Sequence, residues 1–398
     1  MIKKYPSHWV ITELENAGKV TTGNPAPQEK QYFINGITPF VRVADLGQLG
    51  DSVYIKNTKD KLNEKINDKL KLYPKGSVLF TKSGMSLLLN QRAILDSNMY
   101  VVSHIGIVIP NQDISSEWIY YWFKTIDFKK YAHATTLPSL KISIIRKMNF
   151  PLPPLNEQTR IVEKIEELFS DLDKATEDLK KTQEQLKIYR QAVLKAAFEG
   201  NKTSNWKHMK LGGLIKVKSG NGLTRSQRLS SGIFFVYGGN GILGKHNKYM
   251  FEETKLIIGR VGVNCGNVHI TRPKSWVTDN AFIVSYDNEK ARQEYLLYYL
   301  EFLNLNKYAG STAQPVISGH KIYPINIKLP NKKEQFEIFS KIEKIFSIIN
   351  KLKETVEQNL SKIEFLRQSI LKKAFEGKLV SQNPKDEPAE KLLERIKQ

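Results

Sequence analysis

The sequence predicts an α+β protein with a pseudo-twofold internal repeat, in which two α/β domains are separated by two long helices that form an antiparallel coiled coil. Three observations lead to this prediction. The chain contains a second copy of itself, two segments carry apolar residues at heptad spacing, and short β-type runs precede each of them. Each copy should therefore consist of one mixed domain followed by one long helix.

The internal repeat is clearest at the end of each copy. The hexamer KAAFEG at 195–200 returns as KKAFEG at 372–377, an offset of 177 residues. The same offset holds without a gap upstream to Glu117, whereas near the front of each copy the offset is 197, where Trp9 matches Trp206. The chain is thus a tandem duplication of about 200 residues, with length changes confined to the front of each copy.

Each copy opens with a mixed region, which we place at 1–154 and 201–331. The runs FVRVADL, GSVLF and YVVSHIGIVIP in the first region, and IFFVYGG, TKLIIGRVG and AFIVSYD in the second, are rich in Val, Ile and aromatic residues. Gly, Asn and Pro separate these runs, which is typical of short strands. The aromatic-rich segments SSEWIYYWFKTIDFKKYA and ARQEYLLYYLEFLNLNKYA follow, and their spacing predicts amphipathic helices packed into each domain core.

The two long helices are predicted at 155–200 and 332–379, and 380–398 is a C-terminal tail. Apolar residues alternate at spacings of four and three along both helices, with charged residues between them. A single amphipathic helix of roughly 60 Å is not expected to stand alone in water, so the two should pair with each other. The expected seam residues are Ile165, Leu172, Leu179, Thr182 and Leu186 in the first helix and Ile342, Ile349, Val356, Asn359 and Ile363 in the second. The polar residues Thr182 and Asn359 are equivalent in the two copies and should help to fix the register.

The positive charge is concentrated in the two mixed regions. The formal net charge is +21, of which segment 1–156 carries +8 and segment 201–333 carries +13. An excess of this size indicates a polyanionic partner, most often nucleic acid, although a lysine-rich surface can also serve solubility alone.

The composition also bears on the compartment. No run approaches the ~18 apolar residues of a membrane span, and no apolar core follows the N-terminal lysines as in a signal peptide. The single cysteine, Cys265, cannot form an internal disulfide. These features predict a cytoplasmic protein.

Catalytic motifs are incomplete in this sequence. Gly239, Gly244 and Lys245 have the spacing of a phosphate-binding loop, but His246 stands where Ser or Thr would hold magnesium. The LPPL at 152–155 lacks both the polar and the aromatic residue of an adenine methyltransferase motif. We therefore assign no catalytic residue, no metal site and no bound cofactor to this chain.

Five stretches are informative together: PLPPLNEQTRIVEKIEELFSDLD, YRQAVLKAAFEG, IIGRVGVNCGNVHI, LRQSILKKAFEG and GKLVSQNPKDEPAEKLLERI. With these stretches and its organisation as domain, helix, domain, helix, the chain resembles the specificity (S) subunit of type I restriction–modification systems over nearly its whole length. One departure is visible, because the second hinge reads KLPNKKEQ where the first reads PLPPLNEQ.

The resemblance implies a non-catalytic subunit that binds double-stranded DNA. In this family each target-recognition domain reads one half of a bipartite site, and the helices space the domains and dock modification (methyltransferase) subunits. The resemblance also implies that these partners use S-adenosylmethionine, and that a restriction (motor-nuclease) subunit uses ATP and Mg. Two alternatives are a self-contained DNA methyltransferase or nuclease, whose motifs are missing, and a coiled-coil tether that binds DNA nonspecifically.

Candidate DNA contacts are basic, amide and hydroxyl side chains near predicted strand ends, since these groups reach base edges and phosphates. The turns FTKSGM and IGRVGVN are equivalent in the two copies. The candidates are Arg42, Lys82, Ser83 and Arg92 in the first domain, and Arg225, Arg228, Tyr237, Asn240, Lys245, His246, Arg260 and Asn264 in the second.

Overall fold

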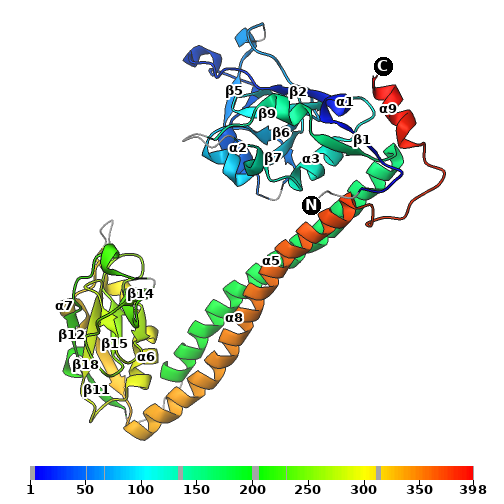
Figure 1. The fold of residues 1–398 in the computed structure, drawn as a ribbon. Helices are drawn as coiled ribbons and strands as arrows, with labels where there is room; N and C mark the ends of the chain where they lie inside the picture. The colour runs from blue at the N-terminus through cyan, green and yellow to red at the C-terminus, as the bar shows by residue number, and fades with distance from the viewer. Residues whose placement is uncertain are drawn as a thin grey trace. The chain divides into compact units, whose positions relative to one another are not determined.

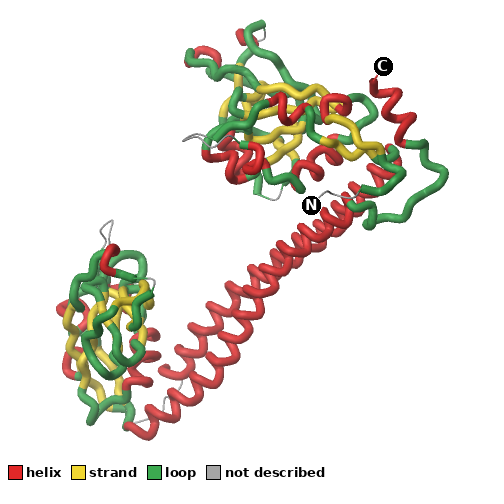
Figure 2. The backbone as a smooth tube through the Cα atoms, in the orientation of Figure 1, coloured by secondary structure: helices red, strands yellow, loops and turns green. Residues whose placement is uncertain are grey.

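The computed structural model describes residues 5–50, 52–66, 68–132, 138–199, 206–229, 231–310 and 315–397 (Figures 1 and 2). The chain divides into two compact units: unit 1 is Met1–Asp178 with Asn359–Gln398, and unit 2 is Leu179–Gln358. The long helices α5 (Leu155–Glu199) and α8 (Lys332–Phe375) each contribute one part to unit 1 and one part to unit 2.

The domain of unit 1 contains a five-stranded sheet of order β2-β9-β6-β7-β4, a three-stranded sheet of order β5-β3-β8, and the pair β1-β10. Its strands are β1 (Val10–Glu13), β2 (Gly18–Thr22), β3 (Thr38–Val41), β4 (Tyr54–Ile55), β5 (Asp60–Leu62), β6 (Val78–Thr81), β7 (Arg92–Leu95), β8 (Tyr100–Val101), β9 (Ile105–Pro110) and β10 (Asn149–Leu152). Its helices are α1 (Leu14–Ala17), α2 (Val43–Gln48), α3 (Ser116–Lys124), α4 (Ile142–Arg146), η1 (Lys30–Tyr32), η2 (Glu64–Ile66), η3 (Met85–Leu89) and η4 (Phe128–Tyr131).

The domain of unit 2 contains a four-stranded sheet of order β12-β18-β15-β16, a three-stranded sheet of order β14-β13-β17, and the pair β11-β19. Its strands are β11 (Lys207–Lys210), β12 (Ile215–Ser219), β13 (Phe234–Gly238), β14 (Gly241–His246), β15 (Leu256–Gly259), β16 (Val268–Ile270), β17 (Trp276–Val277), β18 (Ala281–Tyr286) and β19 (Asn326–Leu329). Its helices are α6 (Gln293–Phe302), α7 (Gly319–Ile322), η5 (Leu211–Gly213), η6 (Arg225–Gln227) and η7 (Leu305–Tyr308).

The two domains share one topology, which confirms the duplication at the level of strand order. The order β2-β9-β6-β7 in the first corresponds to β12-β18-β15-β16 in the second, and β5-β3-β8 corresponds to β14-β13-β17. Even the parallel pairing recurs, between β3 and β8 in one domain and between β13 and β17 in the other. Strand β4 and helix α2 are additions of the first domain.

The aromatic-rich helices α3 and α6 lie in the domain cores, as predicted. In α3 the six consecutive residues from Trp118 to Phe123 are all buried, and the hydroxyl of Ser115 caps the helix by accepting the backbone N–H of Trp118. In α6, Tyr295, Leu296 and the residues 298–300 are buried. These rings are therefore core side chains and do not form an exposed stacking surface for bases.

The repeated hexamers place a phenylalanine of each long helix in the core of the domain that the other copy provides. The ring of Phe375 in α8 lies 4.4 Å from that of Trp118 in α3, between centroids. The ring of Phe198 in α5 lies 5.7 Å from Tyr295 and 5.0 Å from Tyr299 in α6. Trp118 and Tyr295 are equivalent at the 177-residue offset, so the two copies exchange the same contact.

The residues of α5 and α8 that share each core show that the two long helices run antiparallel. In unit 1, Ile165 near the start of α5 shares a core with Leu371 near the end of α8. In unit 2, Val193 near the end of α5 shares a core with Ile342 near the start of α8. The start of one helix thus meets the end of the other in both units, which confirms the predicted antiparallel pair (Figure 1).

One predicted seam residue is wrong. Buried seam residues are Ile165, Ile342, Ile349, Val356 and Ile363, and half-buried ones are Leu172, Leu179, Leu186 and Asn359. Thr182 is exposed, and the next residue, Gln183, is half-buried in its place. A straight α-helix has 3.6 residues per turn, so a strict heptad pattern drifts by about 20° per repeat and the inward position passes to the following residue.

The same drift brings two arginines to the helix interface. The guanidinium of Arg190 in α5 lies 3.7 Å from the ring centroid of Phe346 in α8, and that of Arg367 in α8 lies 4.9 Å from Phe169 in α5. Both the arginines and the phenylalanines are equivalent at the 177-residue offset. Each contact is thus repeated with the roles of the helices exchanged, as across a twofold axis, which confirms the pseudo-twofold repeat.

The carboxylate partners of the two arginines differ. Arg190 makes a two-pronged ion pair with Glu301 of α6, at 2.7 Å from Nε to Oε1 and 2.8 Å from Nη2 to Oε2. Arg367 pairs instead with Asp173 of α5, because the position equivalent to Glu301 is occupied by Lys124. Among the described residues, this arginine forms an ion pair with the adjacent domain in unit 2 but not in unit 1.

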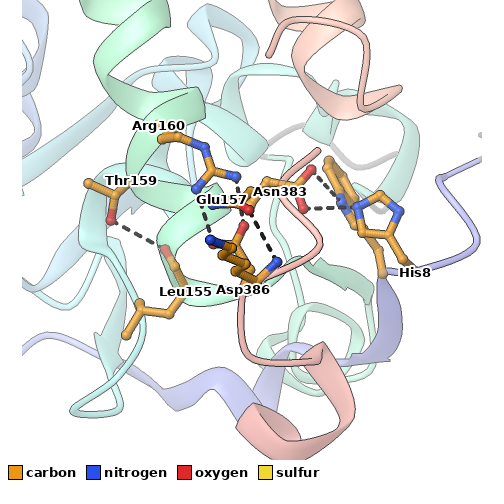
Figure 3. A network of polar contacts seen from close by, with 9 residues as sticks. His8, Leu155, Glu157, Thr159, Arg160, Asn383 and Asp386 are labelled. Carbon is orange, nitrogen blue, oxygen red and sulfur yellow. Dashed lines mark hydrogen bonds and ion pairs between the residues drawn. The ribbon is translucent and has the colours of Figure 1, made fainter. Parts of the chain in front are cut away.

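Unit 1 is tied to the helices by the chain termini (Figure 3). The buried carboxylate of Glu157 in α5 accepts the indole N–H of Trp9 at 3.1 Å and lies 2.9 Å from Nε2 of His8. Arg160, one turn along α5, pairs with Asp386 in the tail at 2.6 Å and holds the pKa of that carboxyl below its usual range. The N-terminal segment, α5 and the tail are thereby joined by polar contacts between buried and half-buried groups.

The tail itself continues into a helix, α9 (Ala389–Lys397), that the sequence did not predict. Its Leu392 is fully buried in the core of unit 1, and its Arg395 pairs with Asp113 at 2.7 Å. The helix is amphipathic and only nine residues long, so it is marginal without this packing.

The departure in the second hinge has a structural consequence. In unit 2, Asn331 stands where Pro154 stands in unit 1, and its side chain caps α8 by accepting the N–H groups of Lys333 and Glu334 at 3.0 Å each. Glu334, the equivalent of Glu157, in turn accepts the Asn331 amide at 2.9 Å. Among the described residues, the indole N–H of the equivalent tryptophan, Trp206, is buried without a partner.

The helix-terminal phenylalanines should dominate the attachment of the helices. Replacing Phe375 or Phe198 by Ala is expected to lower the free energy of unfolding by about 3–5 kcal/mol, because each removes a buried ring and leaves a cavity. Urea denaturation of each variant measures the loss. Phe365→Ala is the control, since that ring is 76% exposed and its removal should change stability by less than about 0.5 kcal/mol. Equal losses at Phe365 and Phe375 would contradict this account.

The ion pair of Arg190 with Glu301 should contribute measurable coupling. A double-mutant cycle with Arg190→Met and Glu301→Gln is expected to give about 1 kcal/mol, because the pair is two-pronged and about three-quarters buried. The exposed pair Lys187–Glu184 is the matched control and should give no more than about 0.5 kcal/mol. Coupling energies that do not differ between the two pairs would refute a special role for Arg190.

Candidate nucleic-acid interface

Two equivalent loops carry predicted DNA contacts at the ends of strands β6 and β15. We call residues 82–85 and 260–263 the glycine-turn loops. Gly84 and Gly262 have φ of +80° and +78°, a backbone conformation that side chains with a Cβ rarely adopt. The reversal of the chain at these glycines ends each strand at the same point of the fold and begins a loop at the domain surface.

The same backbone hydrogen bonds hold both loops. The bonds are Lys82 N to His104 O (3.0 Å), Gly84 N to Pro138 O (2.9 Å) and Leu140 N to Lys82 O (2.9 Å) in the first domain, and Arg260 N to Asn280 O (2.9 Å), Gly262 N to Pro315 O (2.9 Å) and Ile317 N to Arg260 O (3.0 Å) in the second. Each loop is thus fixed on both sides by neighbouring segments. The two loops therefore have the same backbone hydrogen-bonding pattern although their side chains differ.

The side chains of the loops combine charge with hydrogen-bonding capacity. Lys82 and Arg260 are half-buried, and within the described part of the chain neither forms an ion pair. Ser83 Oγ lies 2.8 Å from Nδ1 of His104, and Arg260 Nη1 lies 3.4 Å from Ser219 Oγ. The Arg260 guanidinium also lies 3.4 Å from Asp279 O and 5.7 Å from the ring centroid of Phe282, so neighbouring segments position it. Among the described residues, neither cation is neutralised by a carboxylate, which suits contact with a phosphate or a base edge.

In the second domain, three predicted residues gather around the glycine-turn loop. Asn240 is exposed in the turn between β13 and β14, and its Oδ1 accepts the Asn267 amide at 3.2 Å. This turn packs closely on the loop, because a Cβ placed on Gly259 would lie 2.3 Å from Asn264 O and 2.6 Å from Gly239 O. Asn240, Arg260 and Asn264 consequently lie near one another.

The remaining candidates of this domain form a second group around the far end of the β13–β14 hairpin. They are Arg225, Arg228, Lys245 and His246. Lys245 lies 5.4 Å over the ring of Phe235, and His246 Nδ1 lies 3.0 Å from Gln227 O. Arg272 also belongs to this group, although the sequence did not indicate it. Its guanidinium lies 4.4 Å from the ring centroid of Phe235, the same ring that Lys245 contacts, and the residue is exposed. No local motif marks Arg272, because strand pairing brings it to this hairpin.

Two candidates are wrong because they lie in the core. Arg92 is 3% exposed, its guanidinium lies 4.0 Å over Phe128, and it donates to Asn90 Oδ1 at 2.6 Å. Desolvation by burial lowers its pKa to about 9. Tyr237 is 5% exposed, and its hydroxyl accepts the backbone N–H of Arg272 at 3.1 Å. Both polar groups serve the interior of the domain and cannot reach a base edge.

Arg42 has a structural explanation of its own. Its side chain pairs with Asp60 and lies 5.0 Å over the ring of Phe40. Its backbone N–H donates to the carboxylate of Asp45 at 2.7 Å, as part of a capping box at the start of helix α2. The ion pair neutralises its charge. Arg42 is accordingly less available for a phosphate than Lys82, which forms no ion pair among the described residues.

The described residues hold no group of three or more His, Cys, Asp or Glu side chains arranged to bind a metal ion. Cys265 is buried, and burial raises the pKa of its thiol. Among the described helices, none combines the length and the hydropathy needed to cross a bilayer.

Comparisons with known proteins give one consistent result. The family model of the type I restriction modification DNA specificity domain matches residues 6–187 and 203–360. The chain is 25% identical to the specificity subunit of the type I restriction enzyme StySPI from Salmonella potsdam, over 99% of this chain and 96% of that protein. It is 23% identical to the EcoKI specificity subunit from Escherichia coli K12, over the same shares.

Solved structures agree on the fold. A chain from a type I restriction–modification system, studied for complex assembly and conformational transition, superposes with a TM-score of 0.74 at 19% identity, over 94% of this chain and 99% of that one. The HsdS subunit from Thermoanaerobacter tengcongensis gives a TM-score of 0.56 at 19% identity, over 94% and 98%. Because the family model covers both copies of the repeat, the chain belongs to the type I restriction–modification DNA specificity family.

Proposed function

We propose that this chain is the DNA-binding specificity subunit of a type I restriction–modification complex, in which each recognition domain reads one half of a bipartite site. The observation that carries the proposal is the pair of glycine-turn loops. They have one backbone geometry but present different side chains, Lys82 and Ser83 in one domain and Arg260 and Val261 in the other. Equivalent loops with different side chains suit a site whose two halves have different sequences.

The charge distribution supports binding to the DNA backbone. The excess of basic residues lies in the two domains and not in the helices, and phosphate contacts from Lys and Arg supply most of the affinity of such proteins. Sequence-independent contacts alone would leave the chain a nonspecific tether. The hydrogen-bonding groups of Ser83, Asn240 and Asn264 beside the cations favour direct reading of base edges instead.

The long helices offer surfaces for the modification subunits. Ile188 and Tyr189 of α5 are 70% and 54% exposed, and the equivalent Phe365 and Leu366 of α8 are 76% and 50% exposed. Large apolar side chains at such exposure favour a protein partner. Since one pair lies in each unit at equivalent positions, the helices can bind two copies of one partner in the same way.

Catalysis is assigned to the partner subunits. The motifs for nucleotide and methyl-donor chemistry are incomplete in this chain, and the family is that of the specificity subunit. We propose that the modification subunits use S-adenosylmethionine and that a restriction subunit uses ATP and Mg. This chain would determine which DNA sequence the complex binds and would supply no reacting group.

Exchange of one domain tests the function. Replacing residues 1–150 by the corresponding domain of another family member, with Trp118 retained for its contact with Phe375, should change one half of the methylated sequence only. The measurement is sequencing of methylated adenines in DNA treated with the complex assembled with its modification subunits. Methylation without any sequence preference would favour the nonspecific tether, and change in both halves would contradict independent reading. Methyl transfer by this chain alone would instead show an enzyme.

The exposed apolar pairs on the helices should govern assembly. Ile188→Ala and Phe365→Ala should each weaken the binding of one modification subunit by about tenfold, without loss of folding stability, because each removes an exposed apolar contact. Analytical ultracentrifugation of the mixed subunits measures the stoichiometry. Lys362→Ala, an exposed polar position one turn from Phe365, is the control. Unchanged assembly in the double variant would place the docking surface elsewhere.

A further inference from the structure

We propose that the residue after each glycine turn, Met85 in the first domain and Val263 in the second, packs against the C5-methyl group of a thymine in its half-site. The inference rests on the proposed function and deepens it by naming one base and the side chain that reads it in each domain. Met85 and Val263 occupy equivalent places, one residue after Gly84 and Gly262.

Both side chains are unusually exposed for apolar residues. Met85 is 63% exposed and Val263 is 83% exposed. A single exposed apolar residue is ordinary on a protein surface and needs no explanation. Here, however, the exposure recurs at one position of two domains that differ in the size of the side chain and in most of their surrounding sequence. Both copies carry an apolar side chain at this position, where solvent exposure alone favours a polar one.

The loop geometry prepares these side chains for contact. The residues before and at each glycine are held by backbone hydrogen bonds of 2.9–3.0 Å to neighbouring segments. These bonds link each turn to neighbouring segments on both sides and favour this conformation before a partner binds. A preformed loop loses little conformational freedom on binding, so even a small apolar contact on it contributes to affinity and specificity.

The neighbouring charges identify the partner. Lys82 and Arg260 stand three residues before the apolar side chains, at the start of the same loops, and form no ion pair within the described chain. A cation in the same loop as an exposed apolar group suits the major groove of DNA, where both groups find partners. There the phosphates and guanine edges accept hydrogen bonds, and the thymine methyl is the only apolar group that the base edges present.

An intercalating wedge is the competing use of an apolar side chain on DNA. Wedge residues are long or bulky, such as Phe, Leu, Ile and Met, and they unstack a base step from the minor groove. Val263 is too short to separate two bases, although Met85 is long enough. Because the two positions are equivalent and their loops have one geometry, a role that both side chains can perform is required. Contact with a methyl group is such a role.

Thymine-to-uracil substitution tests the inference, since it removes only the methyl group. The recognition sequence is first mapped by sequencing adenines methylated by the wild-type complex with its modification subunits. Each thymine of a synthetic site is then replaced by uracil in turn, and binding of the complex is measured at one salt concentration. We expect one thymine in each half-site whose replacement weakens binding by roughly three- to tenfold.

The variants assign each thymine to its side chain. Met85→Ala should abolish the uracil effect in the half-site of the first domain and leave the other half-site unchanged, and Val263→Ala should do the reverse. Met85→Leu should retain the effect, because it keeps the apolar bulk. Urea midpoints equal to that of the wild type establish that the variants are folded.

Three results would overturn the inference while leaving sequence-specific binding intact. They are a half-site without any thymine, uracil effects that persist in both Ala variants, and a rise in 2-aminopurine fluorescence that reveals unstacking by a wedge. Failure of the proposed function would look different, because the wild-type complex would then show no sequence preference at all.

Discussion

The exchange of one aromatic contact between the two copies holds the structure together. Phe375 of α8 lies against Trp118 in unit 1, and Phe198 of α5 lies against Tyr295 in unit 2. Each long helix therefore leaves the domain of its own copy and ends in the core of the other domain. Around these contacts the helices also bury each other, since Ile165 shares a core with Leu371 in unit 1 and Val193 shares a core with Ile342 in unit 2.

The duplication gives the two units equivalent contacts between the helices, but the helices are attached to the two domains in different ways. The stacking of Arg190 on Phe346 and of Arg367 on Phe169 is equivalent in the two units. In unit 2 the arginine continues to Glu301 and so connects helix and domain, whereas in unit 1 the tail supplies the connection through Asp386.

In the glycine-turn loops, the shape of the backbone does not depend on which side chains the loop exposes. Backbone hydrogen bonds and a glycine with positive φ fix the shape of each glycine-turn loop, and none of these depends on the side chains that the loop exposes. Apart from Gly84 and Gly262, the loop shape therefore does not depend on which side chains stand at 82–85 and 260–263. Under the proposed function, this independence would let one scaffold read two different half-sites.

The duplication, the order of domains and helices, and the antiparallel pair could all be predicted from the sequence by itself, because repeats and heptads appear as regular spacings of residues along the chain. It also placed Lys82 and Arg260 correctly at equivalent strand ends. Only the tertiary structure decided which polar residues are buried: Arg92 and Tyr237 face the core because strand pairing surrounds them with aromatic rings and backbone donors. Likewise Thr182 left the seam because helix drift accumulates over several turns, which no single heptad reveals.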